Sequence, residues 1–290
     1  MENKMEIGAG RQVLLIADAA GYGKVGISAM QPVLSHLGCN LYNLPTALIS
    51  NTFNYGKYAV LDTTSYMRQS IGIWDELGFR FDAIATGFMS SLEQAELVRS
   101  FCERQRARGA LVLTDPVMAD EGELYQGLPE ETINYMRRLL PVSDFIVPNF
   151  TEACCLAGIP WTPDPVSPAA MGSLVEKLRA LGARSVVVTS AEVSGVGHAV
   201  SCWDDRAKRS FTIPYDYIPV FFPGTGDIFS SVFLGRTLEG WGMEKAVRSA
   251  MDAVRELVRV NRGNEDKFKG VQVESCLSVI DETAPCGEKP

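Results

Sequence analysis

Phe222-Pro223-Gly224-Thr225-Gly226-Asp227 is followed directly by the apolar run Ile228-Phe229-Ser230-Ser231-Val232-Phe233-Leu234. Two glycines around a threonine allow a tight backbone turn and leave bare N–H groups open to a ligand. The apolar residues after the turn recur at helical spacing, as Ile228 and Val232 show. The stretch therefore predicts a loop that opens a buried helix, whose first N–H groups and positive dipole end form an anion site.

Asp227 gives this anion site a second property. A carboxylate is unsuited to binding a phosphate, but it can accept a proton from a hydroxyl while the adjacent N–H groups hold a phosphoryl charge. The alternative is an ordinary aspartate that caps a helix after a glycine-rich turn. Motifs elsewhere in the sequence are needed to choose between these two interpretations of Asp227.

The bulk composition narrows the class of protein. The 290 residues are 46% hydrophobic and 21% charged, as in an ordinary soluble globular protein. A net charge of −8 without a Lys/Arg run argues against a nucleic-acid-binding surface. No apolar stretch approaches the roughly 20 residues that span a bilayer.

The seven cysteines are odd in number and lack Cys-x-x-Cys spacing, so we interpret them as reduced thiols in a cytoplasmic protein. The chain has two histidines, His36 and His198. Neither has a partner at ligand spacing, which argues against zinc and against a Ser-His-Asp hydrolase.

Short apolar runs alternate with helical segments along the chain. The predicted strands are 12–18, 81–86, 110–116, 144–147 and 185–190, with extended chain over 41–50 and 196–221. The predicted helices are 27–37, 61–77, 92–108, 132–140, 167–181 and 243–260. This alternation predicts a single α/β domain over residues 1–290, with a largely parallel central sheet covered by helices on both faces. We expect its core at about 12–262, with a weakly ordered leader over 1–11 and a loose tail from 281.

Polar residues follow successive predicted strands. They are Asp18, Thr46, Asp115, Asn149, Glu152, Thr189, Ser190 and Asp227, with Phe88 among them. Ligands of such sheets bind beyond the carboxyl ends of the strands. Several carboxylates at one edge would repel each other without a cation, so Mg²⁺ with nucleotide phosphates is the expected ligand. Asn149 and Glu152 also fit a helix cap with its partner three residues on.

Gly21-Tyr22-Gly23-Lys24-Val25-Gly26 is an isolated G-x-G-x-x-G pattern after the first predicted strand. It lacks an acidic residue at the end of a second strand about 20 residues on, so it predicts a substrate loop rather than a dinucleotide loop. The chain has no Gly-x-x-x-x-Gly-Lys-Ser/Thr motif, which excludes a P-loop enzyme.

Taken together, these motifs resemble the ribokinase-like superfamily. Gly224-Thr225-Gly226-Asp227 matches its anion-hole and catalytic-base motif, and 148–152 fits its Asn-x-x-Glu motif. Asp115-Pro116-Val117-Met118-Ala119-Asp120 is similar to the corresponding stretch of its vitamin kinases. Thr46, Ser50-Asn51, Tyr55-Gly56-Lys57 and Gly21-Tyr22-Gly23 resemble the substrate side of pyridoxal kinases, and the resemblance runs from about Val13 to Asn261.

The resemblance implies a three-layer ribokinase-like fold and ATP-dependent phosphorylation of the 5′-hydroxymethyl group of a vitamin B6 vitamer, in the salvage of pyridoxal 5′-phosphate. Asp227 would be the base, and the N–H groups of Gly224, Thr225 and Gly226 would be the anion hole. Asp115 and Glu152 would organise Mg²⁺, partly through water. Asn149, Thr189 and Ser190 would line the ATP site, while Asp18, Thr46, Tyr22 and Phe88 would hold the pyridine substrate. Residues 119–128 would form a flap over ATP, a monovalent cation such as K⁺ could assist, and a homodimer is implied.

Three positions depart from the family pattern. Asp18 stands where many pyridoxal kinases carry Ser, and a carboxylate there can pair with a protonated pyridine or an amine. Thr52 stands where many relatives have His, and Ala119 replaces the usual Gly. A hydroxymethylpyrimidine kinase of thiamine synthesis is the nearest alternative, although those enzymes commonly end the anion-hole motif in Cys. The second alternative is a non-catalytic B6- or nucleotide-binding protein.

Overall fold

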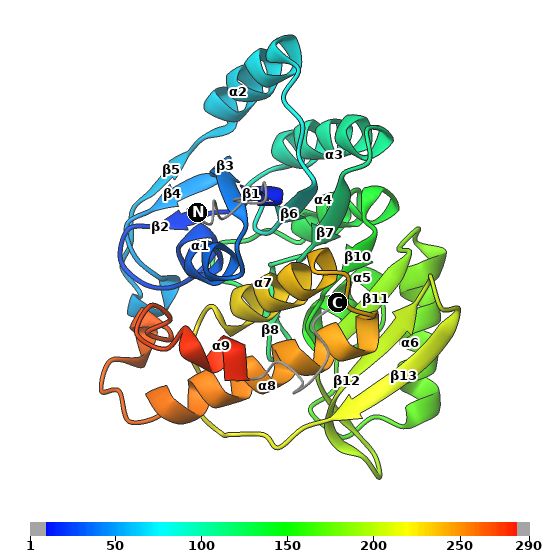
Figure 1. The fold of residues 1–290 in the computed structure, drawn as a ribbon. Helices are drawn as coiled ribbons and strands as arrows, with labels where there is room; N and C mark the ends of the chain where they lie inside the picture. Colours follow the sequence, from blue (N-terminus) through cyan, green and yellow to red (C-terminus); the bar gives the residue numbers. More distant parts are fainter. Residues whose placement is uncertain (1–9, 283–290) are drawn as a thin grey trace, which may run out of the picture.

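An eight-stranded sheet runs through the computed structural model, which describes residues 10–282 (Figure 1). The strand order is β13-β12-β11-β10-β7-β6-β1-β3. The strands from β11 to β3 pair in parallel, and β12 and β13 add an antiparallel edge. Their bounds are β1 Gln12–Ile16, β3 Asn40–Asn43, β6 Ala83–Thr86, β7 Leu111–Thr114, β10 Phe145–Ile146, β11 Ser185–Val193, β12 Gly197–Asp204 and β13 Arg209–Pro214.

Strand β1 shows why its sequence is an unbroken apolar run. Val13 and Leu15 belong to the core on one face of the sheet, whereas Leu14 and Ile16 belong to the core on the other. All four side chains are fully buried. Because successive strand residues point to opposite faces, a strand covered on both faces has to be apolar throughout.

Helices cover both faces of the sheet, which confirms the predicted α/β fold class. One core is built with α1 (Ile27–His36), α7 (Thr225–Leu238) and α8 (Met243–Asn261), and α9 (Ser278–Glu282) packs on α8. The other core is built with α2 (Thr64–Leu77), α3 (Leu92–Ala107), α4 (Glu131–Arg137), α5 (Phe150–Ala157) and α6 (Pro168–Ala180). Short 3₁₀ turns lie at Phe53–Tyr55, Leu140–Val142 and Lys267–Lys269.

A second, smaller sheet corrects the prediction that residues 61–77 are one helix. Strands β2 (Ala19–Ala20), β4 (Ala47–Ile49) and β5 (Val60–Asp62) pair with one another, and α2 begins only at Thr64. Leu61 has helical spacing to α2, but its backbone pairs with Leu48 of β4. Tertiary pairing therefore outweighs the local periodicity.

The predicted acidic flap contains a two-stranded hairpin, β8 (Ala119–Asp120) with β9 (Glu123–Leu124).

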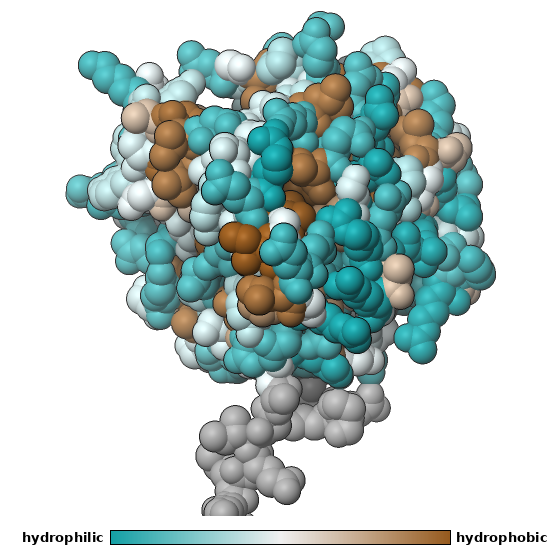
Figure 2. All heavy atoms as spheres, turned by 90° about the horizontal axis from the view of Figure 1, so that it is seen from above, coloured by the Kyte–Doolittle hydropathy of each residue, from teal (hydrophilic) through white to brown (hydrophobic). Residues whose placement is uncertain are grey.

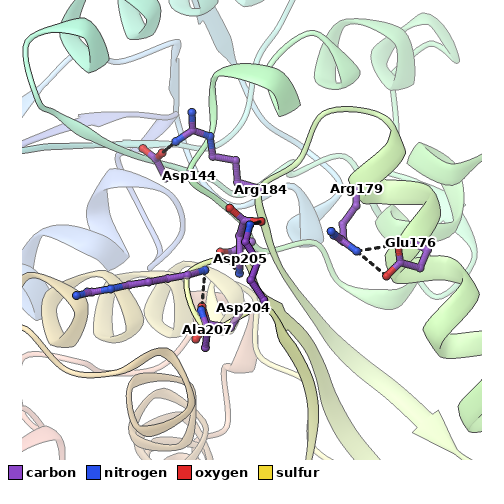
Figure 3. A network of polar contacts seen from close by, with 10 residues as sticks. Asp144, Glu176, Arg179, Arg184, Asp204, Asp205 and Ala207 are labelled. Atoms are coloured by element: carbon purple, nitrogen blue, oxygen red, sulfur yellow. Dashed lines mark hydrogen bonds and ion pairs between the residues drawn. The ribbon is translucent and has the colours of Figure 1, made fainter.

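The amino ends of the parallel strands are held by a polar network (Figure 3). Asp144, just before β10, accepts a hydrogen bond from Arg184 at 3.2 Å and from the Val112 N–H at 3.0 Å. Asp204 accepts from the N–H groups of Arg206 and Ala207 and so closes the β12–β13 turn. Asp144 therefore ties β7 to the start of β11, and Asp204 shapes the turn between β12 and β13.

Most of the predicted leader (1–11) and tail (from 281) lie outside the described residues. Within residues 10–282, no helix combines the length and the apolar character needed to cross a bilayer.

Candidate active site

A cleft of about 770 Å³ lies at the carboxyl ends of the parallel strands. Of the predicted site residues, those that line it are Asp18, Phe88, Asp115, Asn149, Glu152, Thr189, Ser190, Gly224, Thr225, Gly226 and Asp227. They come from six separate stretches of the sequence. The structure therefore brings these predicted residues together in one cleft.

The glycine-rich turn before α7 is held in a conformation that requires glycine. Gly224 is the N-cap of α7 and has φ +84°. A Cβ atom there would lie 1.8 Å from the carbonyl oxygen of Lys24. Gly224, Thr225, Gly226 and Asp227 line the cleft, so the first turn of α7, with its unpaired N–H groups, lies at the cleft wall, as an anion site needs.

Asp227 lies in the first turn of α7, where its carboxylate accepts a hydrogen bond from the Gly26 N–H at 2.8 Å. Burial raises the pKa of Asp227 well above its usual range, and the nearby carboxylates of Asp18 and Asp115 raise this pKa further. The Gly26 N–H opposes that rise. An aspartate with a raised pKa at a helix N-terminus is suited to accept a proton near neutral pH.

Gly26 lines the cleft and was not among the predicted site residues. Its φ is +52°, and a Cβ atom there would lie 2.6 Å from a carboxylate oxygen of Asp18. The glycine pattern 21–26 was the available signal, but spacing alone does not show that this N–H reaches Asp227, which lies 201 residues further on.

Asp115 follows β7 and is almost fully buried. It accepts a hydrogen bond from the Ser230 hydroxyl at 2.9 Å, and Ser230 lies one turn after Asp227 on α7. Burial raises the pKa of Asp115 to about 7, and the Ser230 hydroxyl opposes this rise. Asp115 and Asp227 are thus two carboxylates of one cluster in the cleft, in which a bound cation would favour the charged forms.

Asn149 and Glu152 form the capping pair that the sequence allowed. The Asn149 side chain accepts from the Glu152 N–H and the Glu152 carboxylate accepts from the Asn149 N–H, both at 2.9 Å. The other Glu152 oxygen accepts from the Met118 N–H at 3.0 Å. Burial, followed by the charge of Asp115, raises the pKa of Glu152 well above its usual range.

Metal binding by these carboxylates stays a prediction. Within the described chain, no group of three His, Cys, Asp or Glu side chains is placed to hold a metal ion. Mg²⁺ needs only one or two carboxylates when phosphates and water supply its other ligands. Asp115 fits that requirement. Both oxygens of Glu152 already accept backbone N–H groups, which favours a contact between Glu152 and Mg²⁺ through water.

The β8–β9 hairpin of the predicted flap is docked on α5. The Asn149 side chain donates to the Ala119 carbonyl at 2.7 Å, and the Gly122 N–H donates to the Thr151 hydroxyl at 3.1 Å. The Trp161 ring packs against Gly122, where a Cβ atom would lie 2.5 Å from it. Tyr125, which the sequence reasoning did not select, follows the hairpin and lines the cleft.

Two predicted substrate residues do not line the cleft. Tyr22 is about half exposed, and its ring lies 6.0 Å from that of Tyr55 and under the Lys269 ammonium. Thr46 is fully buried, and its hydroxyl is without a hydrogen-bond partner among the described residues. Their roles toward a substrate stay predictions.

The far half of the cleft was largely missed by the sequence analysis. Thr189 and Ser190 lie at a bulge of β11, where Ser190 has φ +60°. Beyond them the wall is aromatic and apolar: it includes His198, Tyr215, Tyr217, Val220, Met251, Val254 and Val258. The His198 and Tyr217 rings are 4.4 Å apart. Apolar residues that line a cleft look like core residues in a sequence, so only the fold identifies them.

Asp18 provides a test of the electrostatics of the cleft. Burial raises its pKa to about 6, so between about pH 4 and 6 the folded chain binds a proton more tightly than the unfolded chain. Stability from Asp18 therefore increases as the pH falls. Between pH 7.5 and 5, urea unfolding should show a gain of about 1 kcal/mol for the wild type that Asp18→Asn lacks. Equal pH dependence of the two proteins would contradict the burial of a charged Asp18.

Comparisons with known proteins find related kinases. A family model described as phosphomethylpyrimidine kinase matches residues 23–271. A pyridoxal kinase of Rubrobacter xylanophilus is 30% identical over 266 residues, which cover 86% of this chain and 87% of that protein. A pyridoxine/pyridoxal/pyridoxamine kinase of Bordetella bronchiseptica is 29% identical over 85% of this chain and 88% of that protein.

Solved structures are similar over nearly the whole chain. A Bacteroides thetaiotaomicron protein assigned as a phosphomethylpyrimidine kinase, in a crystal form with pyridoxal, has a TM-score of 0.88 and 30% identity over 94% of this chain and 96% of that chain. A pyridoxal kinase of Lactobacillus plantarum has a TM-score of 0.82 and 26% identity over 93% of this chain and 96% of that chain.

The fold, the cleft and these comparisons define a small-molecule kinase of the ribokinase-like superfamily. Within that class, the chain belongs to the phosphomethylpyrimidine kinase family and, more narrowly, to its pyridoxal kinases.

Proposed function

We propose that this chain transfers the γ-phosphoryl group of ATP to the 5′-hydroxymethyl group of a vitamin B6 vitamer, with Asp227 as the base. The observation that carries the assignment of the base is the position of Asp227, which lines the cleft at the start of α7 between the Gly26 N–H and the glycine turn. Relatives that are pyridoxal kinases support the reaction and the substrate class.

Asp227 accepts the proton of the substrate hydroxyl as its oxygen attacks phosphorus. One Asp227 oxygen is bonded to Gly26, which fixes the carboxylate and leaves the second oxygen for the substrate. The N–H groups of Gly224, Thr225 and Gly226 stabilise the charge of the transferring phosphoryl group, helped by the positive end of α7. The reaction therefore takes place at the junction of the glycine turn and its helix.

The residues around Asp115 hold the phosphates of ATP. Bound Mg²⁺ would neutralise phosphate charge there, with Asp115 as its carboxylate ligand and Glu152 in contact through water. Glu152 and Asn149 also fix the chain at Met118 and Ala119, so they set the position of the hairpin above the phosphates. Thr189, Ser190 and the aromatic and apolar wall bind the nucleoside. We also propose that a monovalent cation such as K⁺ assists the reaction.

Asp18 and Phe88 hold the vitamer at the other end of the cleft. Asp18 has a pKa of about 6 and so is largely charged at neutral pH, where it pairs with a protonated pyridine or an amine. Phe88 packs beside Ile49 under the small sheet and supplies an apolar wall for the ring. The site therefore favours vitamers that carry a positive charge, above all pyridoxamine.

A direct assay tests the proposed function. The purified protein is incubated with Mg-ATP and, separately, with pyridoxal, pyridoxamine, pyridoxine or hydroxymethylpyrimidine, and the phosphorylated products are measured. Turnover of the B6 vitamers is the expected result. Turnover of the pyrimidine alone would assign the chain to thiamine synthesis, and binding of the ligands without turnover would make it a non-catalytic binding protein.

We also propose that the chain forms a homodimer through the outer face, which we define as Leu48, Leu61, Tyr66, Ile73 and Leu77. These side chains are 44% to 63% exposed, although all are apolar or aromatic. Leu48 and Leu61 are paired on the small sheet, and the others lie on α2. Figure 2 shows the side of the molecule on which α2 lies, with apolar areas among hydrophilic ones.

Light scattering during size-exclusion chromatography tests the dimer. The 31.7 kDa chain is expected to elute at twice its mass, and Leu61→Glu is expected to elute as a monomer with an unchanged circular dichroism spectrum. A wild-type monomer, or a dimer that tolerates Leu61→Glu, would contradict the assignment of this face.

We further place the protein in the cytoplasm, because the described cysteines are free thiols, and cell fractionation would test that location.

A further inference from the structure

The C-terminal clasp, which we define as residues 266–274, packs against the glycine loop 21–26. The Lys24 N–H donates to the Lys269 carbonyl at 2.8 Å, and the Lys24 ammonium forms an ion pair with Glu274. Gly270 has φ +77°, and a Cβ atom there would lie 2.9 Å from the carbonyl oxygens of both Lys24 and Pro223. The clasp therefore contacts the glycine loop and the start of the anion-hole turn at the same point.

The clasp also holds the loop at 52–56. The buried Thr52 hydroxyl donates to the Phe268 carbonyl at 2.8 Å. The Tyr55 hydroxyl donates to the Asp266 carboxylate at 2.6 Å, and the Tyr55 ring meets the Phe268 ring edge-on with centroids 5.5 Å apart. Thr52 lines the cleft, so the contacts of the clasp extend to the substrate side of the site.

These two sets of contacts meet at the glycine loop. The Thr52 N–H donates to the Tyr22 carbonyl at 3.2 Å, and a Cβ atom at Gly23 would lie 2.4 Å from the Thr52 methyl group. The same loop ends at Gly26, whose N–H is bonded to Asp227. A continuous series of contacts thus runs from Asp266 through Tyr55, Thr52 and the glycine loop to Asp227.

We infer that the clasp is a positioning element for Asp227, and that the hydrogen bond between Tyr55 and Asp266 keeps it closed on the glycine loop. Tyr55 touches neither Asp227 nor the anion-hole turn, so it acts only through the loop. The inference rests on the proposed function for the catalytic role of Asp227. The closure of the clasp on the glycine loop is independent of that role.

Tyr55→Phe tests the clasp because it keeps the ring and removes the hydroxyl. The loss of one charge-assisted hydrogen bond should make amide hydrogen exchange over residues 21–27 about tenfold faster. The kcat for pyridoxal should fall roughly tenfold with the KM for ATP unchanged, since a base that is slightly displaced slows the chemical step rather than nucleotide binding. Asp266→Asn, whose amide oxygen still accepts the hydroxyl, should show at most a small part of either effect.

The matched control is Tyr42→Phe, which removes a hydroxyl bonded to Gln12 at the edge of the sheet. It should leave both measurements unchanged. Unchanged exchange over 21–27 in Tyr55→Phe would overturn the clasp, whether or not the wild type has kinase activity. Faster exchange with an unchanged kcat would overturn the link to Asp227. A wild type without turnover of any vitamer would overturn the proposed function, and the exchange measurement would still decide whether the clasp closes on the loop.

Discussion

The kcat for a B6 vitamer falls about 10³-fold in Asp227→Asn, because general-base catalysis is lost while the shape of the side chain is kept. The amide cannot take the proton of the attacking hydroxyl. Its oxygen can still accept the Gly26 N–H, so the glycine loop should keep its place. We therefore expect unchanged binding of Mg-ATP by calorimetry, and a kcat measured from the phosphorylated product that is close to the detection limit.

Asp204→Asn is the control for the loss of a buried carboxylate. Asp204 is an almost fully buried aspartate that closes the β12–β13 turn and does not line the cleft. Asp204→Asn should lower stability and keep kcat. Retention of more than about a tenth of the wild-type kcat by Asp227→Asn would show that Asp227 is not the base.

Gly224→Ala is expected to impair both activity and folding. The new Cβ atom would lie 1.8 Å from the Lys24 carbonyl oxygen, so the anion-hole turn and the glycine loop have to separate. A displacement of about 1 Å in the anion hole should lower kcat about 10²-fold. Overpacking together with the left-handed backbone should lower the free energy of unfolding by about 2–4 kcal/mol, measured by urea denaturation.

Gly240→Ala separates the effect of the left-handed backbone from the effect of the close contact with Lys24. Gly240 has φ +91° but nothing within 4 Å of an added Cβ atom, and it lies after the C-terminal end of α7. This control should lose about 1 kcal/mol from backbone strain alone and keep its kcat. If Gly224→Ala behaved like Gly240→Ala, the close contact between the two loops would not be needed for catalysis.

The sequence predicted the fold class and the strand-end residues of the cleft because both are encoded locally. The Gly224–Asp227 motif opens a helix, and the strand-end residues Asp115 and Asn149 lie in the cleft because parallel strands end at one edge. The alternative for Asn149 and Glu152, a capping pair, is also present in the structure. A structural cap and a place in the site are compatible.

What the sequence could not predict depends on contacts between distant residues. The helix predicted over 61–77 includes Leu61 and Asp62, which lie in β5, because pairing with β4 is not visible in a periodic pattern. The Gly26 bond to Asp227 joins residues far apart in the chain, so no spacing indicates it. Tyr22 was expected at the substrate because its motif resembles a substrate loop, but its ring lies outside the cleft, against Tyr55.

The clasp has a consequence for the synthesis of this protein. Lys24 and Lys269, which are joined by a backbone hydrogen bond, are 245 residues apart (269 − 24). At translation rates of about 5–20 residues per second, the glycine loop is made roughly 12–50 s before its clasp. The catalytic centre is therefore completed late on the ribosome, after most of the sheet has emerged. A nascent chain that has not yet reached the clasp should be folded over much of its length but enzymatically silent.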